Sequence, residues 1–184
     1  MDLIGHSFGA TIAMRLAIEQ PELVRSVTMI EPVYFAAAIA DGPEQIRASL
    51  GTNQEFKDAW ASGDTYAAAR AFNRAWGDGT KWADFSDRAR TYMADRIHFV
   101  VCSSGFLEHD SAGLLRDGMF DRATMPALLI EGAASSKFAG IVNRSIASRL
   151  PNAIRVRIEG AGHMVPITHP KEVAVPIRAL LDRS

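Results

Sequence analysis

Apolar residues fall along this chain in two alternating patterns. Short apolar or β-branched runs are typical of strands buried in a parallel sheet, and stripes spaced by three and four residues are typical of helices packed on one face. The runs lie at residues 3–4, 24–30 and 126–132. Helical stripes lie at residues 8–19, at 137–150 and in a last helix that begins at Pro170. This order predicts an α/β fold with mostly parallel strands flanked by helices.

A further strand is predicted by a different pattern. Apolar and charged residues alternate strictly between Ala153 and Glu159. Such alternation is typical of a strand with one wet face or of a strand at the edge of a sheet. A glycine-rich turn, residues 160–163 with the sequence GAGH, separates this strand from the last helix.

The middle of the chain, residues 33–124, interrupts the alternation. Turn-rich joints there separate stretches with a helical pattern, at residues 44–50, 56–61, 65–76 and 85–101. All three tryptophans, all three tyrosines and most of the phenylalanines lie in this segment. We therefore predict a helical insertion between two core segments, residues 1–32 and 125–184. Most of its rings are expected to form the insert's own core, and a few to line an apolar pocket.

Composition narrows the class of protein. The chain has 184 residues, of which 48% are hydrophobic and 22% charged, as in an ordinary globular domain. A net charge of −1 predicts no attraction to nucleic acid or to anionic membranes. The lone Cys102 excludes an internal disulfide framework, and no segment has the pattern of a signal peptide or a membrane span. We therefore expect a cytoplasmic protein.

The strongest chemical signal lies at residues 5–9, with the sequence GHSFG. It matches the G-x-S-x-G nucleophile elbow, in which a strand ends at a strained serine and a helix begins at once. The flanks agree, because a predicted strand precedes the motif and a predicted helix follows it. Since the strained serine crowds its neighbours, only a very small side chain is expected to fit at Gly5 and Gly9. Ser7 is thus the candidate nucleophile.

A serine hydroxyl is a poor nucleophile at neutral pH, so Ser7 needs a base within hydrogen-bond reach and an acid that fixes the tautomer of that base. Of the five histidines, His163 is placed best, because it follows the last predicted strand in a glycine-rich turn. A structural role for His163 is the alternative. The other four are placed less well: His6 points away from the strand edge, His98 and His109 belong to the insert, and His169 starts the last helix.

The elbow, together with residues 162–166 (GHMVP) and His169-Pro170, resembles the α/β-hydrolases and their catalytic-histidine loop. The resemblance covers most of the chain, which looks like the carboxyl-terminal two-thirds of such an enzyme with a helical lid inserted. It implies an oxyanion hole that uses the backbone N–H of Phe8. The second donor of that hole belongs in the family to a loop that precedes the elbow, and that loop is not in this chain.

The acid departs from the family's commonest pattern. That pattern places an aspartate shortly after the glycine that ends the seventh strand, whereas this chain continues from Gly132 as AASS. Glu31 is the favoured candidate, because it ends the strand before the insert, where some relatives carry their acid and where parallel sheets bind ligands. Glu131 is the weaker candidate, and a Ser-His dyad without an acid is the third possibility.

The resemblance implies acyl transfer to water: hydrolysis of an ester, a lactone or a carbon–carbon bond in a small, apolar substrate. A serine at the elbow argues against the aspartate-dependent chemistry of dehalogenases. No metal or organic cofactor is expected, since no His/Cys cluster has ligand spacing. The alternative function is that of an inactive hydrolase fragment that completes its sheet by pairing with a partner or with a second copy.

Overall fold

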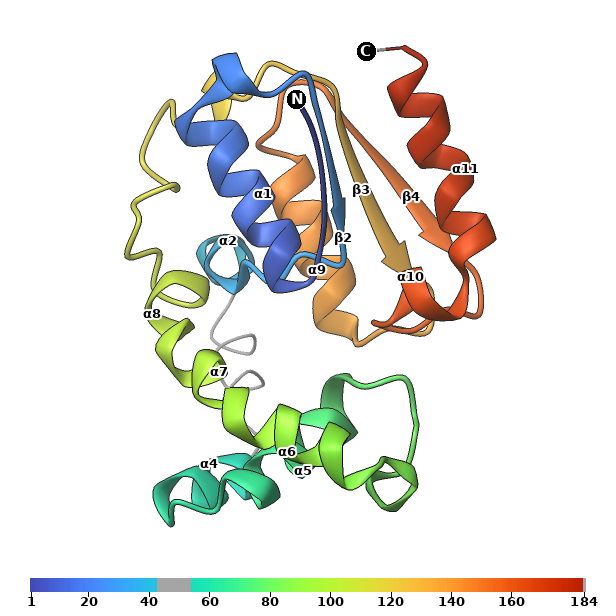
Figure 1. Ribbon diagram of the computed structural model, residues 1–184. Helices are drawn as coiled ribbons and strands as arrows, with labels where there is room; N and C mark the ends of the chain where they lie inside the picture. Colours follow the sequence, from blue (N-terminus) through green and yellow to red (C-terminus); the bar gives the residue numbers. More distant parts are fainter. Residues whose placement is uncertain (43–53, 184) are drawn as a thin grey trace.

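The computed structural model describes residues 1–42 and 54–183. Four strands form one parallel sheet in the order β1-β2-β3-β4 (Figure 1). They are β1 (Asp2–His6), β2 (Ser26–Ile30), β3 (Ala127–Gly132) and β4 (Ala153–Ile158). Their register aligns Ile4 with Thr28, Thr28 with Leu128, and Leu128 with Ile154. The predicted α/β class and its four strands are confirmed, and β4 lies at an edge as its alternating pattern indicated.

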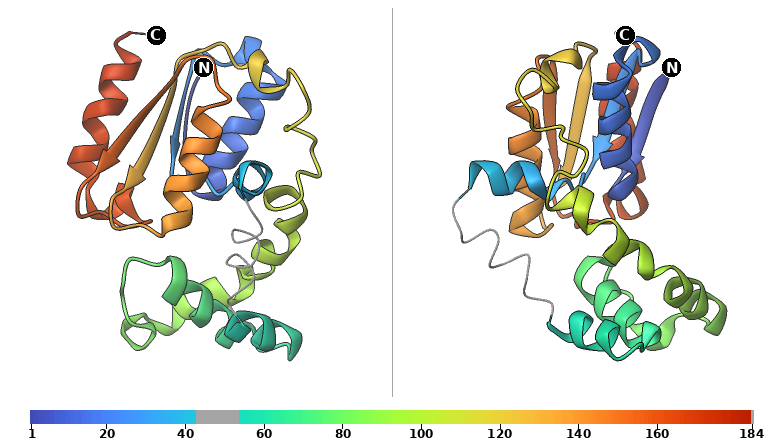
Figure 2. Two further views of the ribbon diagram at one scale, coloured as in Figure 1. Left: turned by 180° about the vertical axis from the view of Figure 1, so that it is seen from behind. Right: turned by 90° about the vertical axis from the view of Figure 1, so that its left-hand side faces the viewer.

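Helices cover both faces of the sheet, because the inner strands are apolar on both sides (Figure 2). Val27 and Met29 of β2 share a core with α1 (Phe8–Glu19) and α9 (Lys137–Ala147). On the opposite face, Ile30 and Ile130 share a second core with α11 (Pro170–Leu181). Short helices complete the connections: η1 (Pro21–Leu23), η3 (Phe120–Arg122) and α10 (Val165–Thr168).

The first strand corrects one expectation. Leu3 and Ile4 were expected in a buried strand, but 54% of Ile4 is exposed. The reason is topological: within the described part of the chain, β1 pairs with β2 alone and therefore forms an edge of the sheet. Its outer backbone groups are unpaired in this structure, as at any sheet edge.

The insert leaves the sheet after β2 and returns before β3, and most of its helices lie beyond the carboxyl ends of the strands (Figure 1). It contains α2 (Phe35–Asp41), α4 (Gln54–Ala61), α5 (Thr65–Trp76), η2 (Trp82–Asp84), α6 (Asp87–Arg96), α7 (His98–Cys102) and α8 (Ser104–Leu107). A small core of its own includes Ala68, Ala94 and Ile97. The helix predicted at residues 44–50 lies outside the described residues.

The single helix predicted at residues 85–101 is wrong, because the segment divides into α6 and α7, and α8 follows after a second break. At the first break, the amides of Ile97 and Val100 bond to carbonyls only three residues back. At the second, the hydroxyls of Ser103 and Ser104 donate to the carbonyls of Val100 and Val101. Such local side-chain bonds compete with the regular helical ladder, so apolar spacing alone could not reveal the interruptions.

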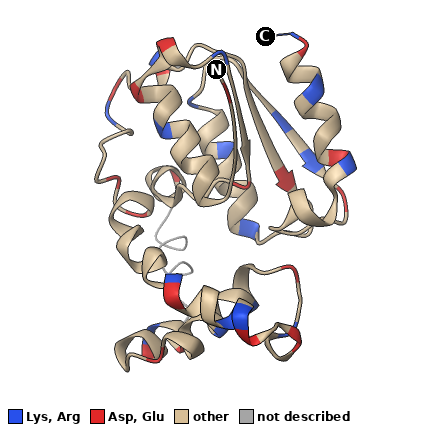
Figure 3. Cartoon of the chain, viewed as in Figure 1, with Lys and Arg blue, Asp and Glu red and all other residues tan. Residues whose placement is uncertain are grey.

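Charged residues are interspersed over the core and the insert, in keeping with the net charge of −1 (Figure 3). In the part of the chain that the structure describes, no helix has both the length and the apolar character needed to cross a bilayer.

Candidate active site

Ser7 stands between the end of β1 and the start of α1, with a backbone φ of 54°. A positive φ is strained for a residue with a side chain, and it makes the chain turn sharply. The amide of Ser7 donates to the carbonyl of Ile30, 2.9 Å away, which ties the turn to β2. The helix therefore begins immediately after the serine, as the elbow pattern predicted.

The two glycines of the motif differ. A Cβ on Gly5 would lie 2.4 Å from the carbonyl oxygen of Gly9, so a side chain cannot fit there without moving backbone. A Cβ on Gly9 would meet nothing within 4 Å. The expectation that both positions exclude a side chain is thus wrong for Gly9, because the crowding arises only where the strand passes the first turn of the helix.

His163 reaches the serine from the loop after β4. Its Nε2 lies 3.0 Å from the Oγ of Ser7, and its Nδ1 lies 3.1 Å from Oε2 of Glu31. An ionised carboxylate can only accept, so Nδ1 carries the proton and donates to Glu31. Nε2 is then left with a lone pair that accepts the hydroxyl proton of Ser7. The structure thus brings together the three residues proposed from the sequence as nucleophile, base and acid.

Glu31 is held firmly at the end of β2. It is 1% exposed and has a positive φ of 49°, a strained conformation for this residue type. Its Oε1 accepts from the amide of Gly132 at 2.7 Å, and its Oε2 accepts from the hydroxyl of Ser135 at 2.9 Å. These donors compensate the buried charge and aim one oxygen at His163.

Glu131, the weaker acid candidate, does not join this group. Its carboxylate, on the neighbouring strand β3, lies 3.2 Å from the guanidinium of Arg155 on β4. An aspartate a few residues after Gly132 is the family's common acid, but in this chain Ser135 stands there and donates to Glu31. Of the two candidate carboxylates, the structure therefore places that of Glu31 beside His163.

His6 was dismissed because it was expected to point away from the strand edge, and its position corrects that expectation. Its Nε2 lies 2.8 Å from the carbonyl oxygen of His163, and the two rings are 5.0 Å apart. Because a carbonyl only accepts, His6 donates from Nε2 and holds the His163 loop. Burial lowers the pKa of His6 below its ordinary value.

His98 and His169 form their polar contacts elsewhere. The ring of His98 bonds to the carbonyl of Asp95 within the insert, and that of His169 contacts the hydroxyl of Thr168. Among the described residues, no three or more His, Cys, Asp or Glu side chains gather as potential metal ligands.

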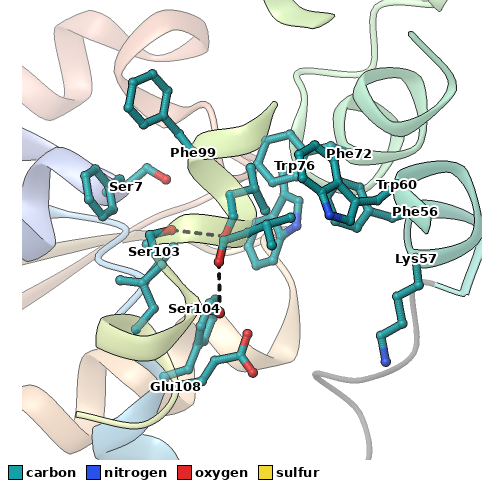
Figure 4. Close-up of a pocket in the computed structure, with 16 residues that line it drawn as sticks. Ser7, Phe56, Lys57, Trp60, Phe72, Trp76, Phe99, Ser103, Ser104 and Glu108 are labelled. Atoms are coloured by element: carbon teal, nitrogen blue, oxygen red, sulfur yellow. Dashed lines mark hydrogen bonds between the residues drawn. The ribbon is translucent and has the colours of Figure 1, made fainter. Parts of the chain in front are cut away.

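A cavity of about 710 Å³ opens beside Ser7, between the core and the insert (Figure 4). Ser7 and Phe8 line it from the core, and Val33 and Phe35 line it from the start of the insert. From the insert it is lined largely by apolar side chains: Phe56, Trp60, Phe72, Trp76, Phe99, Val100, Val101 and Leu107. Polar side chains also line the cavity: Lys57, Ser103, Ser104 and Glu108. The two serine hydroxyls donate to backbone carbonyls. The wall therefore offers a ligand mainly apolar surface.

Phe8 is the first residue of α1, so its amide has no acceptor within the helix. The amino end of the helix also carries partial positive charge. This amide is therefore available as a donor, and its role in an oxyanion hole stays a prediction.

Sequence reasoning missed three residues of the site: His6, Ser135 and Trp76. The indole of Trp76 contacts the His163 ring at 5.1 Å. Only Ser135 left a signal in the sequence, since a hydroxyl stands near the position where the family's acid is expected. The contacts of His6 and Trp76 join segments that are remote in the sequence.

The parallel sheet and the sharp strand–serine–helix turn define the class of this protein: α/β proteins with a nucleophile elbow. The chain belongs to the alpha/beta hydrolase fold family, whose model matches residues 1–170. The resemblance proposed from the elbow and the histidine loop is thereby confirmed.

Two solved structures share the fold. A bromoperoxidase from Bacillus anthracis is 20% identical with a TM-score of 0.68, and a carboxylesterase of the thaumarchaeon Nitrososphaera gargenis is 18% identical with a TM-score of 0.65. Both comparisons cover 98% of this chain, but 67% and 64% of the respective solved chains. At these identities, the likeness shows the fold alone.

One curated protein, polyketide synthase ThaQ of Burkholderia thailandensis, is 26% identical over 190 residues. That match covers 99% of this chain and 8% of the synthase. The chain thus spans about two-thirds of the solved relatives and a small part of this curated one.

Proposed function

We propose that the chain is a serine hydrolase that transfers an acyl group from an apolar ester, lactone or related substrate to water. The observation that carries the proposal is the unbroken path of polar contacts from Ser7 through His163 to Glu31. A hydroxyl, an imidazole and a buried carboxylate in this order can activate a serine at neutral pH.

The proposed reaction has two halves. In the first, the Oγ of Ser7 attacks the substrate carbonyl carbon while Nε2 of His163 takes the hydroxyl proton. The carbonyl oxygen gains the negative charge and is stabilised by the amide of Phe8. The tetrahedral intermediate then expels the alcohol, which receives the proton from His163, and an acyl-Ser7 ester remains.

In the second half, His163 takes a proton from water as the water oxygen attacks the acyl carbon. Collapse of this intermediate releases the carboxylic acid, and the proton returns to the Oγ of Ser7. Glu31 stays ionised throughout and stabilises the imidazolium that forms twice in each cycle.

An apolar substrate is supported by the cavity walls, and the helical insert acts in this proposal as the lid above the serine. Acyl chemistry is also consistent with the relatives, among them a carboxylesterase and a polyketide synthase. The test is hydrolysis of p-nitrophenyl esters by the purified protein, with Ser7→Ala as control. Turnover that disappears in Ser7→Ala supports the proposal, whereas equal turnover by both proteins refutes it.

A second candidate is a binding role through the free edge of β1, without catalysis. The observation that favours it is the exposure of Ile4, 54%, and of Met1, 63%, along that edge. Light scattering tests this role, because edge pairing predicts a dimer that Ile4→Lys dissociates. A monomer that hydrolyses esters refutes it.

A further inference from the structure

Trp76 occupies a fixed position at the end of α5. Its neighbour Gly77 ends the helix, and the amide of Gly77 donates to the carbonyl of Asn73 at 2.7 Å. A Cβ on Gly77 would lie 2.5 Å from that carbonyl oxygen and 2.6 Å from the Oδ1 of Asn73. The chain therefore turns closely at the end of the helix, directly after Trp76.

The indole of Trp76 contacts His163 and Phe35, the first residue of α2. Its ring lies 5.1 Å from that of His163, at 70°, and 6.0 Å from that of Phe35. Contacts of this edge-to-face kind are favourable between aromatic rings. Trp76 is thus a point at which the insert packs directly on the imidazole beside Ser7.

Two polar contacts fix the direction of the His163 ring, but they leave it free to rock about the line through its two nitrogens. Ring contacts restrict that motion, and two are present, from His6 at 5.0 Å and from Trp76 at 5.1 Å. His6 also holds the backbone of His163. Trp76 contributes packing without a polar bond to His163, so its effect on the ring is steric.

The same indole belongs to an aromatic wall of the cavity. Phe72 stacks on Trp76 with centroids 6.5 Å apart, and Phe56 follows at 6.4 Å from Phe72 (Figure 4). Phe72 and Trp76 are four residues apart on α5, so they lie on one face of the helix. An apolar group that lies along this wall extends away from Ser7 and contacts Trp76 at the end nearer to His163.

We propose that Trp76 is both the positioning residue for His163 and the specificity residue of the cavity, which takes uncharged esters with a long or aromatic apolar group. This inference rests on the proposed hydrolase function. The two roles are separable, because positioning acts on every substrate, whereas the wall acts only on substrates long enough to reach it.

The kinetic test compares Trp76→Ala, Trp76→Phe and Trp60→Ala on p-nitrophenyl acetate and decanoate. Trp76→Ala is expected to lower kcat for the acetate about tenfold, and Trp76→Phe to restore it to within about threefold, because a ring again packs on His163. Trp60 lines the cavity, whereas the rings in contact with His163 in the described part of the chain are those of His6 and Trp76, so Trp60→Ala is expected to raise KM for the decanoate only. Trp82→Phe, a change within the insert's own packing, is the control for the fold.

A spectroscopic test does not depend on turnover. With Trp60→Phe and Trp82→Phe combined, Trp76 is the single tryptophan of the chain. Since the His163 ring packs on the indole, His163→Leu is expected to change the intensity or the wavelength of the emission. In the same protein with Ser7→Ala, an uncharged long-chain methyl ketone is expected to shift the emission to the blue.

The outcomes separate the two proposals. If the wild type shows no turnover but both emission changes occur, the serine-hydrolase function fails while the placement of Trp76 and the apolar ligand class stand. If Trp76→Ala keeps the wild-type kcat for the acetate, or if His163→Leu leaves the emission unchanged, the positioning role is refuted. If Trp76→Ala changes KM for the acetate and for the decanoate by the same factor, or if the ketone leaves the emission unchanged, the specificity role is refuted.

Discussion

Replacing Glu31 by glutamine changes the electrostatics of the proposed site with little change in shape. One carboxylate oxygen becomes an NH₂ group, so the side chain must donate where it formerly accepted. The amide of Gly132, 2.7 Å from Oε1, still requires an acceptor, which forces the amide oxygen of glutamine to that side. The NH₂ group then faces both Ser135 and Nδ1 of His163.

That orientation reverses the tautomer of the imidazole. An NH₂ donor requires Nδ1 of His163 to accept, and the ring proton moves to Nε2, where it faces the Oγ of Ser7. The nitrogen that should accept the serine proton then carries a proton itself. A comparable change in a Ser-His-Asp triad lowers kcat about 10⁴-fold, and we expect a loss of that order in Glu31→Gln.

Stability should change far less than activity. The bond from Gly132 is retained, and the hydroxyl of Ser135 can rotate so that it accepts from the new NH₂ group. The three charge-assisted bonds to the carboxylate become neutral ones, at a cost of about 1 kcal/mol each, and the removal of a buried charge offsets part of that cost. The free energy of unfolding in urea should therefore fall by no more than about 2 kcal/mol.

Glu131→Gln is the matched control, because Glu131 is also nearly buried at the end of a strand but pairs with Arg155. The assay is the initial rate of ester hydrolysis for both variants, with circular dichroism as the check on folding. We expect Glu131→Gln to retain most of the wild-type rate. A folded Glu31→Gln protein with wild-type turnover would refute the tautomer argument, and loss of activity in Glu131→Gln alone would reassign the acid.

Three further predictions concern the elbow, the support of the acid and the pH dependence of stability. Gly5→Ala should prevent folding or strongly lower the thermal midpoint, since its Cβ would lie 2.4 Å from a backbone oxygen, while Gly9→Ala should be tolerated; equal midpoints for the two variants would refute this contrast. Ser135→Ala removes a 2.9 Å bond to Glu31 and should lower kcat about tenfold with KM unchanged, whereas Ser135→Thr should recover activity; a wild-type kcat in Ser135→Ala would show that the hydroxyl is dispensable. Burial lowers the pKa of His6 below 6.5, so the folded protein binds fewer protons than the unfolded chain under acidic conditions. The contribution of His6 to the free energy of unfolding is therefore full above pH 6.5 and is lost as the pH falls through the pKa of the folded state. Urea unfolding should show this decline, and His6→Gln should make it less steep.

Local features of the site could be predicted from the sequence. The elbow is one such feature, because its strand, strained serine and helix lie within consecutive residues. The position of Glu31 at the end of β2 also followed from one segment, since a strand that ends at Glu31-Pro32 places its last side chain at the sheet edge. The α/β class followed in the same way from the alternation of strand and helix patterns.

The choice between Glu31 and Glu131 required the folded structure, because both residues end parallel strands. The choice depends on which carboxylate faces the loop of His163, and that loop is remote in sequence from both. The breaks in the insert's helices were likewise hidden, since they arise from serine hydroxyls that bond to nearby carbonyls rather than from the apolar pattern.

The aromatic residues of the insert illustrate the same limit. Their number indicated an apolar core and a pocket, but it did not show which rings would pack in the core and which would line the pocket. Phe56, Trp60 and Phe72 do both, because they pack against the insert's own core and line the cavity. Trp76 instead packs on His163, a contact between distant segments that no local pattern encodes.

The central claim is that Ser7 is a nucleophile activated by His163. The most direct measurement is the site of covalent modification by a fluorophosphonate probe, located by mass spectrometry of the peptides. The account predicts one adduct on Ser7, absent in Ser7→Ala and formed at least about 10²-fold more slowly in His163→Ala. A folded protein that remains unmodified, or an adduct on another residue, would contradict it.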